Sequence, residues 1–432
     1  MEAFKTLLPE FCVLTISVCL FLGVILYNRL HRGPLCIFFF LIFTELYTPA
    51  YYYVMTSTES YVHFGVETLR TYIWMSTAAF LVYSMILAVF QRVDFRPSRL
   101  AVTRWGIPAP AAKSFLLLLV VGITALLVLY LAYYREGLPL YQAIFHSTWL
   151  DRPDTTGGVP HWFTISAFLC VAFPCFYLYY HQRCSFSWFT NLLLIGAVSL
   201  FMVVGGNKGF VVYWFLFLWV YLWGMKLDMR ILIVGGISVI VLLIIMTGTT
   251  DVFSLSGFLS GLEYGIGRFF LTQGAMLVNR IEMIRQGFVF DLSSITAQVY
   301  TFVYEQDGGS SPTYYLGDLI VEFSLLRGFL LHLVVFTILA AISRWLACQP
   351  FSEYKTWLFF CIQYFLGINS ICSSFLFRLA LVIALLLMFM AFGEPESAGF
   401  SSDTVPRNVP RKPHSVRRLR RPVFEEAVKR SE

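Results

Sequence analysis

Residues 114–134 read SFLLLLVVGITALLVLYLAYY and contain no charged side chain. A helix of this length measures about 30 Å, which matches the hydrocarbon core of a bilayer. Comparable apolar runs recur along the 432-residue chain, which is 58% hydrophobic and only 13% charged. Soluble domains carry about 25% charged residues. The sequence therefore predicts an all-α, polytopic integral membrane protein.

The apolar runs predict about 11 transmembrane helices within a single membrane domain, residues 1–392. The run 356–370 is too short for a full crossing, so it and 375–392 form either two crossings or a re-entrant pair. Two long connecting segments, 135–161 and 248–315, lie on the same predicted side. The predicted spans are 11–29, 36–55, 71–91, 114–134, 162–180, 187–204, 209–225, 231–247, 325–346, 356–370 and 375–392.

The orientation follows from the distribution of positive charge. When the C-terminal tail is placed inside, most of the 31 Lys and Arg residues fall on inner segments. The N-terminus and both long loops are then outside, which is the periplasm in a bacterial inner membrane, and the C-terminus is cytoplasmic. The tail, 393–432, is basic and rich in proline, which predicts a disordered segment that contacts anionic lipid. We expect no binding to nucleic acid.

Several classes of site have no signature in the chain. The motifs GxxxxGK[ST], GxGxxG, HExxH and GxSxG are absent, as is any CxxC pair among the nine cysteines. Nucleotide-driven transport, a metal centre, a disulfide framework and a bound cofactor are therefore not predicted.

Basic residues occur in the outer segments, where membrane topology disfavours them. Arg152 lies between Asp151 and Asp154, so it either forms a local ion pair or contacts an anionic group. Lys208 lies in the sequence GGNKGF, residues 205–210, at the predicted start of the next helix. The positive end of that helix would add to its charge, which favours phosphate binding. The alternative is a lysine that reaches the membrane interface.

A helix is also predicted within the second outer loop, at 267–286. At 100° per residue, one line along it holds Arg268, Thr272, Ala275, Asn279, Glu282 and Gln286, to within about 40°. Such a helix either lies in the membrane surface or lines a cavity with its polar face. Arg268, near its start, is the best candidate for contact with a ligand.

Ionisable residues inside or next to the predicted spans are costly unless they are paired or hydrated. Glu45 and Arg378 lie within spans, and Asp318, Glu322 and His332 share one face around the start of the ninth span. Each of these residues is either functional or the ion-pair partner of another. Together they place the polar interior of the protein toward the outer leaflet.

Four segments resemble the Wzy-type O-antigen polymerases, which belong to the oligosaccharide repeat-unit polymerases. Residues 205–210 resemble the glycine–basic turn of that family, which often has Arg where this chain has Lys208. Residues 137–139 followed by Arg152 resemble its first large outer loop, and Arg268 opens a segment similar to the Arg-bearing helix of the second. Residues 315–322, leading to Gly328, resemble the segment before a late span, although the family commonly has Gly after the acidic position and this chain has Phe323 and Ser324.

The resemblance implies a GT-C-like membrane glycosyltransferase at the periplasmic face of the inner membrane. Its substrates would be oligosaccharide repeat units linked to undecaprenyl pyrophosphate, polymerised into the O-antigen of lipopolysaccharide. Cations would stabilise the departing pyrophosphate, so neither a metal nor another cofactor is needed. A chain-length regulator protein would be a partner, in addition to membrane lipid. The predicted catalytic residues are Lys208, Arg268 and Glu322, and the predicted pyrophosphate- or sugar-binding residues are Arg152, Arg378, Arg280, Asp318 and Glu45.

Two alternatives remain open at this point. An O-antigen ligase would transfer the finished chain, and we expect it to have a His-centred site in its large outer loop, whereas 248–315 contains no His. A flippase or exporter of lipid-linked oligosaccharide would have charge along a path through both leaflets and a repeat symmetry. The charge in this chain gathers toward the outer side.

Overall fold

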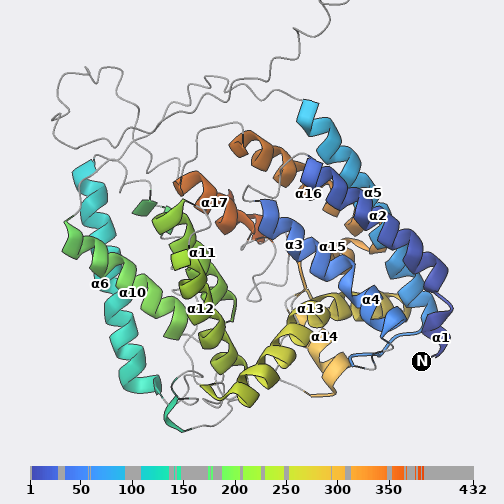
Figure 1. The fold of residues 1–432 in the computed structure, drawn as a ribbon, viewed down its shortest axis with the longest axis horizontal. Helices are drawn as coiled ribbons and strands as arrows, with labels where there is room; N and C mark the ends of the chain where they lie inside the picture. The colour runs from blue at the N-terminus through green and yellow to red at the C-terminus, as the bar shows by residue number, and fades with distance from the viewer. Residues whose placement is uncertain are drawn as a thin grey trace, which may run out of the picture. The chain divides into compact units, whose positions relative to one another are not determined.

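The computed structural model describes a protein built from α-helices, and the residues that it describes contain no β-strand (Figure 1). These residues lie within the unit Met1–Glu394, one of two into which the chain divides. They are 2–27, 35–56, 58, 60–92, 109–135, 141, 144–146, 174–175, 177–178, 187–204, 208–224, 229–247, 253–292, 294–306, 313–347, 353–363, 366, 375, 378–380 and 382–383. Most of the predicted spans 162–180 and 375–392, and the whole of the tail 393–432, lie outside them.

The N-terminal helices form a group in which α2 (Leu8–Tyr27) runs parallel to α5 (Val66–Arg92). At one end Arg70 Nε donates to Glu10 Oε1 at 3.2 Å, and toward the other end the ring of Phe21 contacts that of Tyr83 at 5.9 Å. The short α1 (Glu2–Lys5) packs against α4 (Thr48–Met55) through Phe4. The N-terminus therefore lies beside the loop between α4 and α5, as the predicted topology requires.

The predicted span 36–55 is wrong as a single helix, because it consists of α3 (Leu35–Leu46) and α4, which are separated at Tyr47. Pro49 has no N–H group, so it cannot donate to the carbonyl oxygen of Glu45 four residues earlier. That carbonyl accepts a 2.6 Å hydrogen bond from the Tyr72 hydroxyl instead. The break also fixes the direction in which the end of α3 approaches the helices around it.

Four further helices match predicted spans in position: α6 (Ala109–Tyr134), α10 (Trp188–Val204), α11 (Lys208–Trp223) and α12 (Met229–Thr247). Helix α10 lies beside both α6 and α11, and α11 packs on α12 (Figure 1). Helix α11 also contacts α17 (Glu353–Gln363), where the ring of Trp357 meets those of Tyr213 and Phe217. No described residue settles whether 356–370 crosses the membrane.

The helix predicted at 267–286 belongs to the longer α13 (Leu255–Arg285), which packs against α3, α4, α5, α12, α14 and α15. Every residue from Ala275 to Ile281 is fully buried, so this stretch of the helix is covered on all sides. Of the two alternatives for 267–286, a helix that lies in the membrane surface does not fit this stretch. A Cβ at Gly274 would lie 2.6 Å from the carbonyl oxygen of Glu45, so glycine permits the close crossing with α3.

Besides α17, three helices follow α13 in the described part of the chain. They are α14 (Ile295–Tyr304), α15 (Tyr315–Phe323) and α16 (Leu325–Ala347). Ser324 separates α15 from α16 with φ 75° and ψ 162°, a conformation that only glycine adopts without strain. A Cβ at Gly328 would lie 2.3 Å from the carbonyl oxygen of Leu319, so the two helices cross in direct backbone contact.

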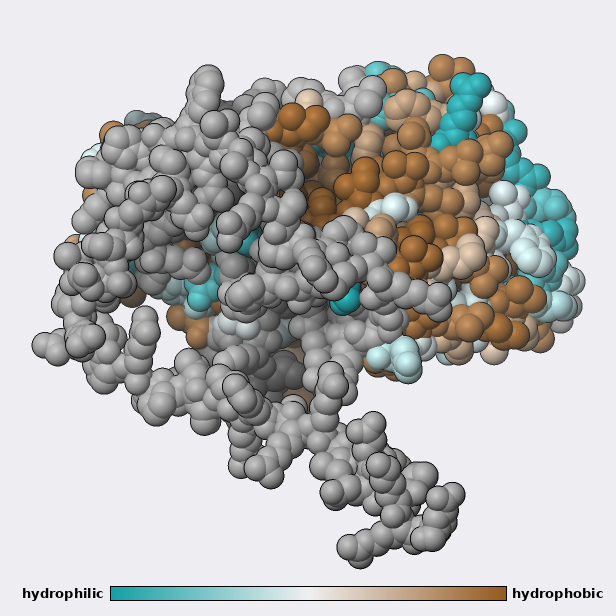
Figure 2. Space-filling model, turned by 90° about the horizontal axis from the view of Figure 1, so that it is seen from above, coloured by the Kyte–Doolittle hydropathy of each residue, from teal (hydrophilic) through white to brown (hydrophobic). Residues whose placement is uncertain are grey.

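Three helical segments of the described part are long and apolar enough to cross a membrane: Leu8–Tyr27, Val66–Phe90 and Leu325–Arg344. Large apolar side chains on them face outward, including Leu26, Met85 and Leu326. Figure 2 shows a broad brown, hydrophobic area on the part of this view that grey residues leave uncovered, with teal, hydrophilic residues along its edge. A lipid environment explains such exposure, so the described helices have the length and composition of a helical membrane protein.

Candidate functional site

Two arginines bind opposite oxygens of one buried aspartate. Arg280 of α13 donates from Nη1 to Asp318 Oδ1, and Arg378 donates from Nη2 to Asp318 Oδ2. The exposed fractions of these residues are 0% for Arg280, 3% for Asp318 and 0% for Arg378. Removing such charges from solvent is costly, and their mutual attraction offsets the cost only when the geometry is good. We refer to these three residues as the Arg–Asp–Arg cluster.

The backbone around Asp318 is shaped to receive the two guanidinium groups. Asp318 lies in the first turn of α15, where the positive end of the helix dipole stabilises a carboxylate. Gly317, just before it, leaves room that a side chain would fill, because a Cβ there would lie 2.8 Å from Arg280 Nη1. Arg378 is held further by a 2.9 Å hydrogen bond from its Nη1 to the carbonyl oxygen of Leu366.

Glu45 is a second buried carboxyl group in this region, with an exposed fraction of 1%. It lies close enough to interact electrostatically with Arg280 and Asp318. Its Oε1 atom has no hydrogen-bond partner in the described part of the chain. The site therefore combines four ionisable side chains from α3, α13, α15 and the segment around residue 378.

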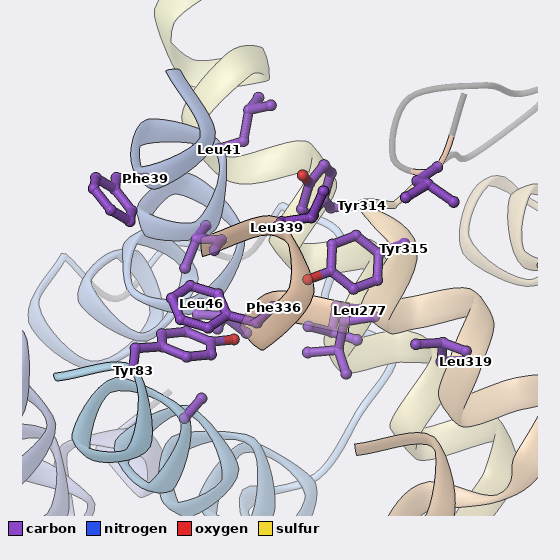
Figure 3. Packing of buried hydrophobic residues seen from close by; sticks show 14 of the residues in the cluster. Phe39, Leu41, Leu46, Tyr83, Leu277, Tyr314, Tyr315, Leu319, Phe336 and Leu339 are labelled. Carbon is purple, nitrogen blue, oxygen red and sulfur yellow. The ribbon is translucent and has the colours of Figure 1, made fainter. Parts of the chain in front are cut away.

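Buried aromatic residues pack around the start of α15, the helix that carries Asp318. Tyr83 of α5 shares a hydrogen bond with Nε2 of His332 of α16, and the ring of Tyr315 lies 4.7 Å from that imidazole. Figure 3 shows Tyr314 and Tyr315 among Leu277 of α13 and Phe336 and Leu339 of α16. All of these aromatic side chains are buried. This packing strengthens the electrostatic interactions of the cluster because it excludes water.

Glu322 has a backbone partner. Its Oε2 accepts a 2.8 Å hydrogen bond from the N–H of Phe375, three residues before Arg378. The Arg378 guanidinium lies 5.9 Å from the ring of the same Phe375. Glu322 thus anchors the segment that carries Arg378, and its carboxylate is positioned toward that backbone.

Four of the eight predicted site residues come together: Arg280, Asp318, Arg378 and Glu45. Glu322 lies one helical turn after Asp318 and is linked to the group through Phe375. Lys208 begins α11 and Arg268 lies within α13, but their side chains are outside what the structure describes. Arg152 lies outside the described residues altogether.

The sequence pattern did not single out Gly317, Tyr83 or the tyrosine pair Tyr314 and Tyr315 as parts of the site. The two adjacent tyrosines come just before Asp318, and this could have indicated that they belong to the site, since tyrosine combines an apolar ring with a polar group. Gly317 had no signal of its own, because its role depends on a guanidinium that arrives from α13.

The residues present favour anion chemistry over metal chemistry. Within the part of the chain that the structure describes, no group of three His, Cys, Asp or Glu side chains has the proximity that a metal ion requires. Guanidinium groups are planar donors that suit phosphate oxygens. No model of a known protein family matches the chain, and neither a curated protein nor a solved structure shows a significant match.

Proposed function

We propose that this protein is a membrane glycosyltransferase that polymerises oligosaccharide repeat units linked to undecaprenyl pyrophosphate. The observation that carries the proposal is the Arg–Asp–Arg cluster, buried beside Glu45 in a helical membrane protein. Ionisable groups at such positions are expensive, so a functional role is the first hypothesis for them. Transfer from a lipid pyrophosphate requires cations that are held in place before the bond breaks.

In the proposed mechanism the acceptor hydroxyl attacks the anomeric carbon of the donor sugar. The bond from that carbon to the pyrophosphate oxygen breaks, and undecaprenyl pyrophosphate leaves with the bonding electrons. Lys208 and Arg268 stabilise the negative charge on the leaving group, and the acceptor proton passes to solvent or to a nearby carboxylate. Helix α13 carries both Arg268, which acts on the leaving group, and Arg280, which belongs to the Arg–Asp–Arg cluster. The two residues lie about 18 Å apart along this helix.

The finer assignments belong to the same proposal. The chain would cross the inner membrane about eleven times in a GT-C-like arrangement, with 135–161 and 248–315 in the periplasm. Contacts between the loop before α5 and α14 support this topology, since both belong to predicted outer segments: the rings of Tyr61 and Tyr304 are 5.7 Å apart. A separate chain-length regulator would act with it.

Lipopolysaccharide banding tests the proposal directly. A strain that lacks the protein should make core with a single repeat unit, whereas loss of a ligase or a flippase would leave bare core. Lys208→Ala and Arg268→Ala should each abolish long chains, because losing one preorganised donor costs about 2.7–4 kcal/mol, a hundredfold to thousandfold in rate. Lys208→Arg should retain much of the activity, whereas Arg268→Lys should lose more if the contact is bidentate.

The matched control is Lys5→Ala, which removes an exposed lysine of α1 far from the site in the chain. Immunoblots of the membrane fraction must show equal amounts of each variant. A normal ladder of chain lengths from an abundant Lys208→Ala, Arg268→Ala double variant would refute the proposal.

A further inference from the structure

A group of aromatic side chains lies where the loop before α5 meets α14. The rings of Tyr300 and Tyr304 stack at 4.4 Å, Tyr61 meets the edge of Tyr304 at 5.7 Å, and His63 meets Phe302 at 5.9 Å. All five residues are half-buried, so part of each remains accessible. Beneath them Met276, Met283, Ile295 and Val299 form a separate small apolar core that supports the group.

An open cleft of about 300 Å³ lies next to this aromatic group. It is lined by residues at the start of α5 and at the end of α13, namely Gly65, Val66, Glu67, Thr68, Glu282, Arg285 and Gln286. The aromatic group and the cleft share the loop 60–65. Asn279 Nδ2 donates to the carbonyl oxygen of Tyr61 at 2.9 Å, one helical turn before Glu282, so α13 holds both features side by side.

The polar groups of the cleft are oriented by one another. Thr68 Oγ1 and the backbone N–H of Gly65 donate to Glu282 Oε2, and Gln286 Nε2 donates to Oε1 at 2.9 Å. Arg285 Nη1 donates to Thr68 Oγ1 at 2.8 Å. Partial burial raises the pKa of Glu282. These hydrogen bonds and the charge of Arg285 together lower the pKa by more than burial raises it, so the pKa lies below its ordinary value. Glu282 is therefore a carboxylate acceptor at neutral pH.

The composition of the cleft distinguishes between classes of ligand. Two carboxylates, Glu67 and Glu282, and one guanidinium, Arg285, line the cleft, and Glu67 is paired with Arg70. The cleft therefore offers no excess of positive charge, which disfavours a phosphate. Sugars present hydroxyl groups around the rim of the ring and C–H groups on its faces. Carboxylate, amide and guanidinium groups together accept and donate hydrogen bonds to hydroxyls, and tyrosine rings offer an apolar surface with a polar edge. The volume is at the lower limit of small-molecule sites, which suits one or two sugar rings.

We propose that the Tyr61–Tyr304 surface and the adjoining cleft form a saccharide subsite that recognises the oligosaccharide part of the substrate. One sugar ring packs on the exposed faces of Tyr61 and Tyr304, and hydroxyls of the same or the next sugar bond to Glu282 and Gln286. The identity of this saccharide as a repeat unit rests on the proposed function. The subsite selects the sugar and contributes binding, while the pyrophosphate is held elsewhere.

The test is direct binding of a free saccharide to the full chain in lipid nanodiscs. The probe is the repeat-unit oligosaccharide released by mild acid from the lipopolysaccharide of the strain that carries the gene, observed by saturation-transfer NMR and titration calorimetry. Tyr304→Leu should weaken binding at least tenfold, and Tyr304→Phe should bind as the wild type does because the ring is kept. Gln286→Ala should weaken binding several-fold. Tyr27→Leu, at a tyrosine that is 87% exposed at the end of α2, is the matched control and should change nothing.

The outcomes separate this inference from the proposed function. Absence of saccharide binding, or equal affinity of Tyr304→Leu and wild type, would overturn the subsite even if Lys208→Ala abolishes polymerisation. Saccharide binding that depends on Tyr304, in a protein whose loss leaves the lipopolysaccharide ladder unchanged, would establish the subsite and refute the polymerase. Because Tyr304→Phe and Tyr304→Leu remove the same hydroxyl, a difference between them reports on the ring alone.

Discussion

A methyl group at Gly317 would come within 2.8 Å of the Nη1 atom of Arg280, and within 2.1 Å of the Thr313 hydroxyl. The absence of a side chain at one position of α15 thus allows a guanidinium from α13 to reach Asp318. Gly317 and Arg280 are therefore parts of one site, although they are far apart in the sequence.

Gly317→Ala should therefore destabilise the protein by about 1–3 kcal/mol, the usual cost of overpacking a dense core. The measurement is the thermal unfolding midpoint in detergent, together with abundance in the membrane. Gly23→Ala is the matched control, because a Cβ there meets nothing within 4 Å. It should leave the midpoint unchanged or raise it slightly, since alanine favours helix more than glycine does. Equal stability of the two variants would show that Arg280 does not need the space.

Ser324→Gly should stabilise the protein by about 1 kcal/mol, because the backbone at Ser324 lies in a region that strains any residue with a side chain. Ser260→Gly is the control at an exposed position further inside a regular helix, α13, and should destabilise by a few tenths of a kcal/mol. The measurement is the thermal unfolding midpoint of both variants in the same detergent. A lower midpoint for Ser324→Gly would mean that the α15–α16 junction has a different conformation in the membrane.

The long apolar runs were sufficient to predict α2, α5, α12 and α16, because burial in lipid requires continuous apolar helices. The break at Tyr47 had a local signal in Pro49, which the hydropathy of 36–55 concealed. Ser324 had no such signal, since serine is uncommon at positive φ.

The sequence predicted which charged residues belong to the candidate site, but it did not predict which of them form ion pairs with each other. Arg280, Asp318, Arg378 and Glu45 each attract notice as charges in apolar surroundings. Which arginine binds which carboxylate depends on how α13, α15 and the segment around residue 378 pack, and this is set by long-range contacts. The predicted polar line on α13 omitted Arg280 for the same reason, since burial on all sides of a helix removes the distinction between its faces.

Glu322 offers a test that separates a positioning role from a catalytic one. Glu322→Gln keeps an oxygen that can accept from the Phe375 N–H, so it should preserve most polymerisation and normal abundance. Glu322→Ala removes the acceptor and should reduce both. The readouts are lipopolysaccharide chain length and immunoblot signal. If the glutamine variant is abundant but makes no long chains, Glu322 exchanges a proton and the catalytic prediction for it is the better one.

Reporter fusions test the orientation on which the outer-face mechanism depends. Alkaline phosphatase inserted at Val289, which is 88% exposed between α13 and α14, should be active because that reporter matures only in the periplasm. A fluorescent protein fused after residue 410 should fluoresce, because it folds in the cytoplasm. The reciprocal fusions, each reporter at the other position, serve as controls. If phosphatase inserted at Val289 is inactive and a fluorescent protein inserted at the same position fluoresces, α14 lies in the cytoplasm and the mechanism is contradicted.

Removal of the shared carboxylate should unfold the site. Asp318→Ala leaves two buried guanidinium groups without their partner, a change that typically costs about 3–5 kcal/mol. The variant should therefore be scarce in membranes. Glu67→Ala is the control: it breaks an exposed pair with Arg70, and such pairs contribute at most about 1 kcal/mol. Wild-type abundance of Asp318→Ala would contradict the ion pairs.

The triple variant Arg280→Met, Asp318→Leu, Arg378→Met then separates the structural role of the cluster from its functional role. Replacing a whole buried ion group by apolar side chains of similar volume is often neutral or stabilising, because no charge is left uncompensated. We expect its abundance and unfolding midpoint to recover toward those of the wild type. Polymerisation should remain weak, since Arg280 and Arg378 are predicted substrate-binding residues and apolar side chains cannot donate charge-assisted hydrogen bonds to the substrate. A triple variant that is abundant and still makes long chains would show that the cluster only stabilises the fold, and the chemistry would then depend on Lys208 and Arg268 alone.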